Sequence, residues 1–133
     1  MKIRIRGNSI RLRLMRGEVD QFGKTGSLEQ TIHFGAALGG SLTYRLQKSD
    51  VADLTPTYRK GMIVIEVPND IASEWVNNQT LIGLKHLANP ESENPLHILV
   101  EKDFKCLQVR KDEDESDAFP NPKGKEEPDA SNS

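Results

Sequence analysis

Four arginines near the start of the chain have the spacing most suited to chemistry. Arg4, Arg6, Arg11 and Arg13 occupy every second position of two short runs, and Ile or Leu occupies the positions between them. Period-two alternation is typical of a half-buried strand, and residues 7–9 (Gly-Asn-Ser) supply a turn between the runs. The pattern predicts a β-hairpin with an apolar face and a ladder of guanidinium groups. Because the planar fork of arginine suits phosphate, the ladder is a candidate anion-binding site.

Like charges on facing strands repel each other, by a few tenths to about 1 kcal/mol per pair, so the ladder needs compensation. Three alternatives stay open: the phosphates of a nucleic acid, the acidic end of the same chain, or a solvated face with acidic neighbours such as Glu29 or Glu66. No aromatic residue is interleaved with the arginines, so the stacking platform typical of single-strand binders is absent.

Cys106 is the second candidate, as a reactive or ligand residue. A thiolate can bind zinc or act as a nucleophile when a histidine lies close. No two of Cys106, His33, His86 and His97 have the close spacing of a structural zinc site. We therefore interpret Cys106 as a small apolar residue at the end of the last strand, and we predict no metal and no cofactor. The acidic run at 112–117 also lacks the glycine and distal glutamate of an EF-hand loop.

The charge of the chain is divided unevenly between its parts. Residues 112–133 contain eight acids and two bases and so carry −6, whereas the whole chain carries −2, which leaves +4 for residues 1–111. Apolar residues become rare from Asp112 onwards, and such a segment buries too little apolar surface to fold. A length of 133 residues fits one domain. We predict a single domain over 1–111 and an acidic, largely disordered tail over 112–133.

Targeting signals are missing from the sequence. No apolar run follows the basic start, and no stretch approaches the roughly 20 apolar residues of a membrane span. One cysteine excludes an intramolecular disulfide. We therefore expect a cytoplasmic protein with no membrane partner.

The elements that must position these residues follow from alternation and turn signals. After the hairpin, the sequence predicts helices over 17–24 and 69–77, the second capped by Asn69 or Asp70, and strands over 27–34, 42–46, 53–58, 62–67, 81–87 and 96–104. Pro56 makes the 53–58 segment a weak edge strand. The order ββαβββ(β)αββ, with short turns and no internal repeat, favours an α+β fold with a mainly antiparallel sheet or half-open barrel and two short helices.

Both ends of the chain are similar to one known family. The start Lys-Ile-Arg-Ile-Arg-Gly-Asn-Ser-Ile-Arg-Leu-Arg-Leu (2–14) and the later Glu-Lys-Asp-Phe-Lys-Cys-Leu (101–107) and Phe-Pro-Asn-Pro (119–122) resemble the two ends of a family of small bacterial proteins of unknown function. The resemblance implies that residues 112–122 belong to the family's pattern. It implies no activity.

A shorter stretch has a second resemblance. Residues 7–14 resemble the G-N-S-x-x-L-R-[IL] run of AbrB/MazE-type swapped-hairpin domains, which are dimeric regulators and antitoxins. In those domains this region contributes to DNA binding, so the resemblance implies a nucleic-acid partner. Residues 15–18 (Met-Arg-Gly-Glu) lack the proline of the family's next segment.

Together these features predict a small binding or regulatory module rather than an enzyme. Its basic hairpin would bind an anionic partner, either a nucleic acid or another polyanion, and its own acidic tail would modulate that binding. Two alternatives remain open. One is a small enzyme or metal-binding protein that uses Cys106 with a histidine, and the other is a homo-oligomer that pairs through the hairpin or the edge near Pro56.

Overall fold

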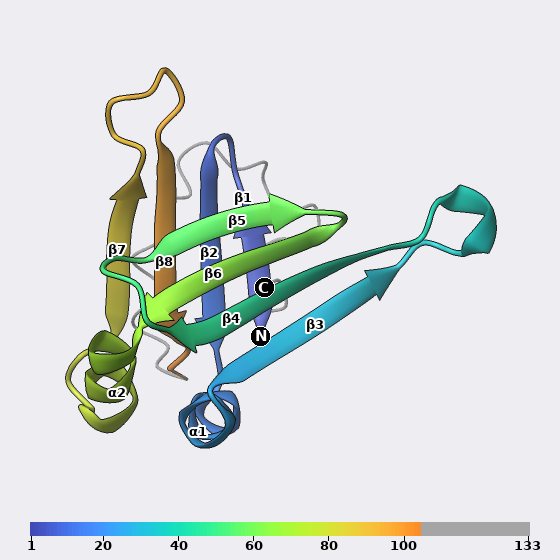
Figure 1. Cartoon of the computed structure of the whole chain (residues 1–133). Coiled ribbons are helices and arrows are strands. Elements are labelled where there is room, and N and C mark those ends of the chain that lie inside the picture. Colours follow the sequence, from blue (N-terminus) through green and yellow to red (C-terminus); the bar gives the residue numbers. More distant parts are fainter. Residues whose placement is uncertain (105–133) are drawn as a thin grey trace, which may run out of the picture.

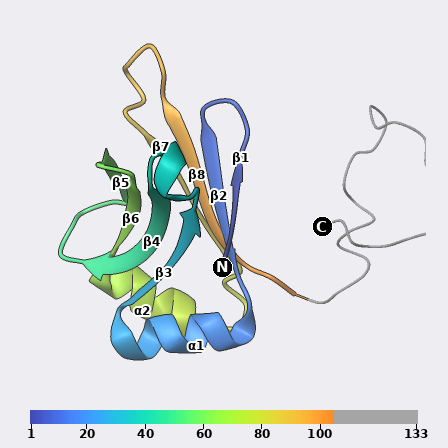
Figure 2. The same cartoon turned by 90° about the vertical axis from the view of Figure 1, so that its right-hand side faces the viewer.

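Two four-stranded β-sheets cross face to face, and two helices close one end of the space between them (Figures 1 and 2). The computed structural model describes residues 1–104, with the exception of the Leu38 side chain. Cys106 and the acidic segment 112–133 therefore lie outside the described residues. Neither helix within residues 1–104 is long and apolar enough to cross a membrane.

Each sheet has a parallel pair of strands at its centre and an antiparallel neighbour on either side. Sheet A contains, in spatial order, β1 (Lys2–Ile5), β2 (Ser9–Leu14), β8 (Leu96–Lys102) and β7 (Gly83–Ala88). Sheet B contains β3 (Ser27–His33), β4 (Ser41–Ser49), β6 (Met62–Pro68) and β5 (Thr55–Arg59). The helices are α1 (Arg16–Thr25) and α2 (Asn69–Asn77), and η1 (Ala36–Leu38) is a short 3₁₀ turn.

The predicted α+β class, with two helices and this order of elements, is confirmed. The predicted mainly antiparallel pairing holds for four of the six strand pairs, but the strands form two mixed sheets instead of one, and these sheets do not close into a barrel. The predicted cap of the second helix also differs. Pro68 is the N-cap, with no capping side chain, and Asp70 accepts only the N–H of Ile71, at 2.9 Å.

The strand order contains a repeat that the sequence does not reveal. The first half of the described chain runs β1-β2-α1-β3-β4, and the second half repeats this order as β5-β6-α2-β7-β8. Each strand has a counterpart at the same place in the other half: β1 and β5, β2 and β6, β3 and β7, β4 and β8. Replacing every strand of sheet A by its counterpart gives the strand order of sheet B. Each half contributes one hairpin to each sheet, so neither half has a complete sheet of its own.

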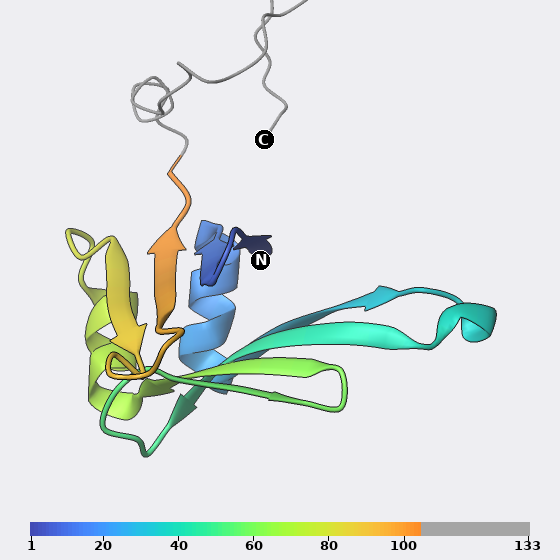
Figure 3. The ribbon, with the colours of Figure 1, turned by 90° about the horizontal axis from the view of Figure 1, so that it is seen from above.

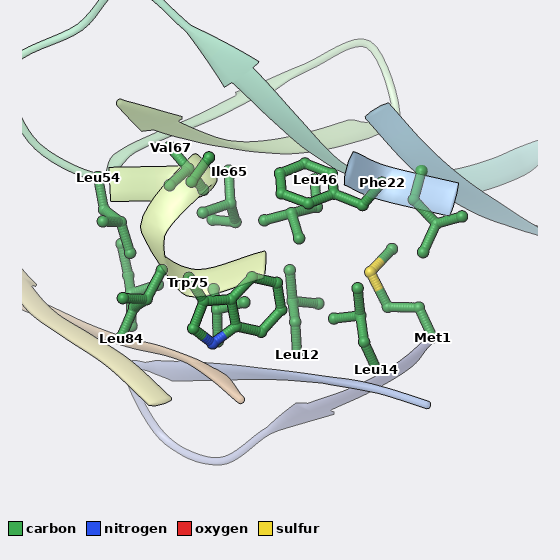
Figure 4. Close-up of a cluster of buried hydrophobic side chains, with 14 of the residues drawn as sticks. Met1, Leu12, Leu14, Phe22, Leu46, Leu54, Ile65, Val67, Trp75 and Leu84 are labelled. Atoms are coloured by element: carbon green, nitrogen blue, oxygen red, sulfur yellow. The ribbon is translucent and has the colours of Figure 1, made fainter. Parts of the chain in front are cut away.

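The core lies between the two sheets and is completed by the helices (Figure 4). Trp75 of α2 is fully buried, its Nε1–H donates to the Ile82 carbonyl at 2.9 Å, and its ring meets Phe22 of α1 edge to face at 6.1 Å between centroids. The Lys102 Nζ lies 5.4 Å from the Trp75 ring centroid and donates to the Asn78 carbonyl at 3.0 Å. Burial lowers the pKa of this ammonium group.

The β3–β4 hairpin extends beyond the body as an arm (Figures 1 and 3). Near its tip, Gly35, Gly39 and Gly40 adopt φ values of 92° to 102°, which favour glycine. The apolar face of the arm continues past the region that sheet A covers. Ile32 and Phe34 are consequently 43% and 51% exposed.

The start of α1 is held by an acidic side chain. Glu18 accepts the Met15 N–H at 2.8 Å and pairs with the amino group of Met1, which also lies 3.5 Å from the Gln30 Oε1. Burial raises the pKa of the Glu18 carboxyl, but the hydrogen bonds from Met1 and Met15 and the Met1 charge outweigh burial. The pKa therefore lies below its usual value of 4.5.

Replacing Glu18 by glutamine tests this arrangement. The glutamine oxygen can still accept the Met15 N–H, but the charge that pairs with the Met1 amino group is lost. We therefore expect Glu18→Gln to lower the free energy of unfolding by up to about 1 kcal/mol at neutral pH. A carboxyl whose pKa is depressed by folding stabilises the protein above its unfolded pKa and loses that effect as pH falls through the folded value. The difference between wild type and variant should therefore shrink below about pH 4.5.

Urea unfolding of both proteins across this pH range provides the measurement. The control is Asp20→Asn on an exposed position of the same helix, which should change stability by less than about 0.5 kcal/mol. A difference between wild type and Glu18→Gln that stays constant with pH would contradict the assigned role.

Candidate anion-binding face

The strands of sheet A direct alternate residues away from the core, and basic side chains dominate that outward face. Leu12, Leu84 and Val100 point inward and are buried, so their sequence neighbours point outward. The register aligns three rows across the sheet, which are Lys2–Arg13–Glu101–Gly83, Arg4–Arg11–Leu99–Lys85 and Ser9–His97–Leu87. We call the five residues Lys2, Arg4, Arg11, Arg13 and Lys85 the basic face.

The structure places the four arginines that the alternation singled out on the same face of sheet A. Arg4 and Arg11 are direct cross-strand partners, and Arg13 lies two residues along β2 from Arg11. Arg6 follows the end of β1 and lies in the turn, where its backbone exchanges hydrogen bonds of 3.1 and 3.2 Å with Ser9. Arg6 therefore stands opposite Ser9, at the turn end of the third row and beyond the strand residues that define the basic face.

One carboxylate partly neutralises the arginines. Glu101 Oε2 lies 2.9 Å from Arg13 Nη2 and 3.4 Å from Arg11 Nε, so a single negative charge serves two guanidinium groups. The predicted neighbours Glu29 and Glu66 belong to sheet B instead. Glu29 pairs there with Arg45, at 2.8 Å.

The remaining basic groups have no such counter-ion. Within residues 1–104 the structure gives no ion pair to Lys2, Arg4 or Lys85. All three side chains are exposed. Among the residues that the structure describes, the basic face therefore carries an excess of positive charge.

A hollow of about 480 Å³ lies across β2, β8 and β7. Six of its lining residues alternate to the outward face, namely Ser9, Arg11, Lys85, Leu87, His97 and Leu99. Leu99 lies between Arg11 and Lys85 in its row, so two cations flank an apolar residue. A phosphate-sized anion at this point could contact a guanidinium and an ammonium group at once.

The turn of the β1–β2 hairpin is tied to the β7–β8 loop. Asn8 Nδ2 donates to the carbonyls of Asn94 and Pro95 at 3.0 and 2.9 Å, and the His97 N–H donates to the Asn8 carbonyl at 3.1 Å. These bonds hold the turn of the hairpin against the second half of the sheet. The basic face is thus part of the folded body and not a free hairpin.

The three histidines are separated in the fold. His33 lies on the arm of sheet B, whereas His86 and His97 point to opposite faces of sheet A. No group of three or more His, Cys, Asp or Glu residues that could hold a metal occurs within residues 1–104. Cys106 lies outside the described residues, so its proposed pairing with a histidine stays a prediction.

Comparison with known proteins assigns the chain to a family. A family model described as a family of unknown function, DUF7009, matches residues 1–123. The chain belongs to DUF7009. A search of curated proteins and a search of solved structures each found no match.

Membership of DUF7009 agrees with the expected family of unknown function. The match runs through the acidic residues 112–117 and the Phe-Pro-Asn-Pro segment at 119–122. These residues are therefore part of the DUF7009 pattern, as the resemblance implied. The AbrB/MazE-type resemblance is not confirmed by this comparison.

Sequence reasoning missed three members of the outward face. Lys2 continues the alternation of Arg4 and could have been included on that signal. Lys85 and Glu101 come from the other end of the described chain. They join the arginines only because β2 pairs with β8 and β8 with β7, and no local pattern indicates that pairing.

Removing the Glu101 charge tests the electrostatics of the face. We expect Glu101→Gln to lower the free energy of unfolding by about 1 kcal/mol at low salt, because Arg4, Arg11 and Arg13 then repel each other without compensation. At 0.5 M salt the loss should fall to roughly half or less, because added ions screen exposed charges.

The matched control is Glu29→Gln, which breaks the exposed Glu29–Arg45 pair of sheet B. A lone exposed pair contributes about 0–1 kcal/mol, so the control should have the smaller effect. Thermal unfolding of the three proteins at two salt concentrations measures this. Equal losses in both variants at both salt concentrations would contradict the shared counter-ion.

Proposed function

We propose that this protein is a small non-enzymatic binding module whose basic face binds the phosphate backbone of a nucleic acid. The observation that carries the proposal is the charge of one sheet surface, whose strands contribute five basic residues and one acid to three aligned rows. Side chains that neutralise several phosphates at once give a strong, salt-dependent affinity.

The charge imbalance is specific to sheet A. Sheet B has the same strand topology. Its outward face carries two acids, Glu29 and Glu66, and two Arg or Lys residues, Arg45 and Arg59. The positive charge of sheet A is therefore not a consequence of the architecture. This contrast supports a role for that surface in recognising anions.

The composition of the face favours a duplex over a single strand. No aromatic residue occurs in its three rows, so successive bases would have no ring to stack on. Lysine and arginine contacts to phosphates bind a duplex without reading its sequence. The resemblance of residues 7–14 to the DNA-binding region of swapped-hairpin domains points to the same class of partner.

The acidic segment would compete for the same face. Residues 112–133 carry −6, and the chain leaves sheet A at the end of β8, beside the row that holds Lys2, Arg13 and Glu101. Residues 105–111 span up to roughly 3.3 Å each when extended, which is enough to return the segment across the sheet. We propose that the segment weakens nucleic-acid binding in the full chain.

Charge reversal on the basic face tests the proposal. In fluorescence anisotropy with a labelled 20-base-pair duplex, we expect binding that weakens with salt, with a logarithmic slope of about −4 for five neutralised phosphates. Arg4→Glu with Lys85→Glu should weaken binding at least tenfold, because two contacts are lost and two repulsions are added.

The control makes the same charge change elsewhere. Lys24→Glu with Arg59→Glu alters an exposed residue of α1 and one of β5 and should leave the affinity within about twofold, since both sites lie outside the basic face. Equal weakening by both double variants would indicate that binding depends only on the net charge of the chain. That result, or the absence of binding at low salt, would contradict the proposal.

Neutralising the acidic segment tests the competition. In a full-length variant with the acids of 112–133 replaced by Asn or Gln, we expect duplex binding to strengthen several-fold at low salt and less at high salt. The measurement is the same anisotropy titration. Unchanged or weaker binding by this variant would contradict the competition by the acidic segment. It would not contradict the proposed binding of a nucleic acid to the basic face.

A further inference from the structure

Within residues 1–104 the β3 strand forms an open edge of sheet B, and its ladder shows which backbone groups face away from β4. The Phe34 N–H donates to Gly40 and the Lys48 N–H donates to Gly26, both at 2.8 Å. Bonded and non-bonded pairs alternate along an antiparallel ladder. The odd-numbered residues of β3 therefore direct their N–H and C=O groups away from β4. Thr25 Oγ1 donates to the Ser27 carbonyl at 2.8 Å and accepts the Ser27 N–H at 3.4 Å, so the open side is formed by Glu29, Thr31 and His33.

This edge lacks the features that usually prevent strands from pairing. The other sheet edges carry Lys2 and Arg4 on β1, Pro56 on β5 and Lys85 on β7, and such residues discourage edge-to-edge contact. The seven residues of β3 include no proline, lysine or arginine. The arm of which β3 is part also extends away from the body (Figure 3).

We propose that β3 pairs with β3 of a second copy of this chain, antiparallel, about a two-fold axis at Thr31. In this register the Thr31 backbone groups of the two copies bond to each other. Glu29 of each copy faces His33 of the other copy. The two sheets B then form one continuous eight-stranded sheet.

The positions of the Glu29 carboxylate and the His33 imidazole select this register. Only odd-numbered residues can bond across the edge, and only the axis at Thr31 places Glu29 opposite a basic side chain. An axis at Glu29 or at His33 would place each of these residues opposite itself. Glu29 already pairs with Arg45 in its own chain, but 47% of its side chain is exposed, so it remains accessible to a second partner.

The same register covers the exposed apolar side chains of the arm. On the inward face of sheet B, Phe34 of one copy would lie opposite Leu28 of the other, and Ile32 opposite Gln30. Ile32 and Phe34 are 43% and 51% exposed in the single chain. Their burial on dimerisation removes apolar surface from water and adds to the backbone bonds.

Sedimentation of the full chain, with three variants of the arm, tests the inference. We expect a concentration-dependent dimer for the wild type. His33→Glu places two acids opposite each other twice in the dimer and should weaken dimerisation about tenfold or more. His33→Lys keeps a basic side chain opposite Glu29 and should leave the dimer intact, so the two variants are matched at one exposed position.

Thr31→Pro provides an independent variant. It removes an N–H that faces the open edge and the side-chain bond of 2.8 Å between Thr31 Oγ1 and Thr43 Oγ1. The backbone bonds between β3 and β4 are retained, and we expect a monomer with native circular dichroism. If Thr31→Pro does not fold, the two His33 variants decide the question. A monomeric wild type at about 100 µM, or a dimer unaffected by both His33→Glu and Thr31→Pro, would overturn the inference.

Discussion

The parallel ladder between β2 and β8 is the interaction on which the rest of the structure depends. It joins the beginning of the chain to the end of the described part, from Ser9–His97 to Leu14–Lys102. On its inward side it aligns Leu12 with Val100, which are both essentially buried. Unpaired backbone groups at such a position would cost the free energy of lost hydrogen bonds, so the ladder and the core must form together.

The outward side of the same ladder builds the basic face. It sets Arg13 beside Glu101 and places Leu99 between Arg11 and Lys85. Charge and stability are therefore linked in this protein, since the strands that close the core also hold like charges together. Glu101 reduces the repulsion without cancelling it, and the positive charge that remains is the basis of the proposed binding to an anionic partner.

Much of the fold could be predicted because local patterns determine it. Alternation predicted the first hairpin and most other strands, and the spacing of Val19 with Phe22 and of Ile71 with Trp75 predicted the helices. Burial was predicted less well. Ile5 alternates with Ile3 but is 58% exposed, because it lies at the end of the hairpin, beyond the cover of the opposite sheet.

Strand partnership could not be predicted, and it determines the candidate site. The two parallel pairs connect strands that belong to different halves of the chain, and sequence alternation shows which face a residue occupies but not which strand lies beside it. Arg4, Arg11 and Arg13 were found from the first hairpin alone. Lys85 and Glu101 could be assigned to the same face only from the pairing of β8 with β2 and β7.

The central claim is that the two ends of the described chain form one anion-binding surface. Titrating the full-length, isotope-labelled protein with a short DNA duplex, and following backbone and side-chain NMR signals, tests it most directly. We expect the largest changes together on β1, β2, β8 and β7, with Arg4, Arg11, His97 and Lys85 among them. Changes confined to the first hairpin, or centred on sheet B, would contradict a surface shared between the two halves.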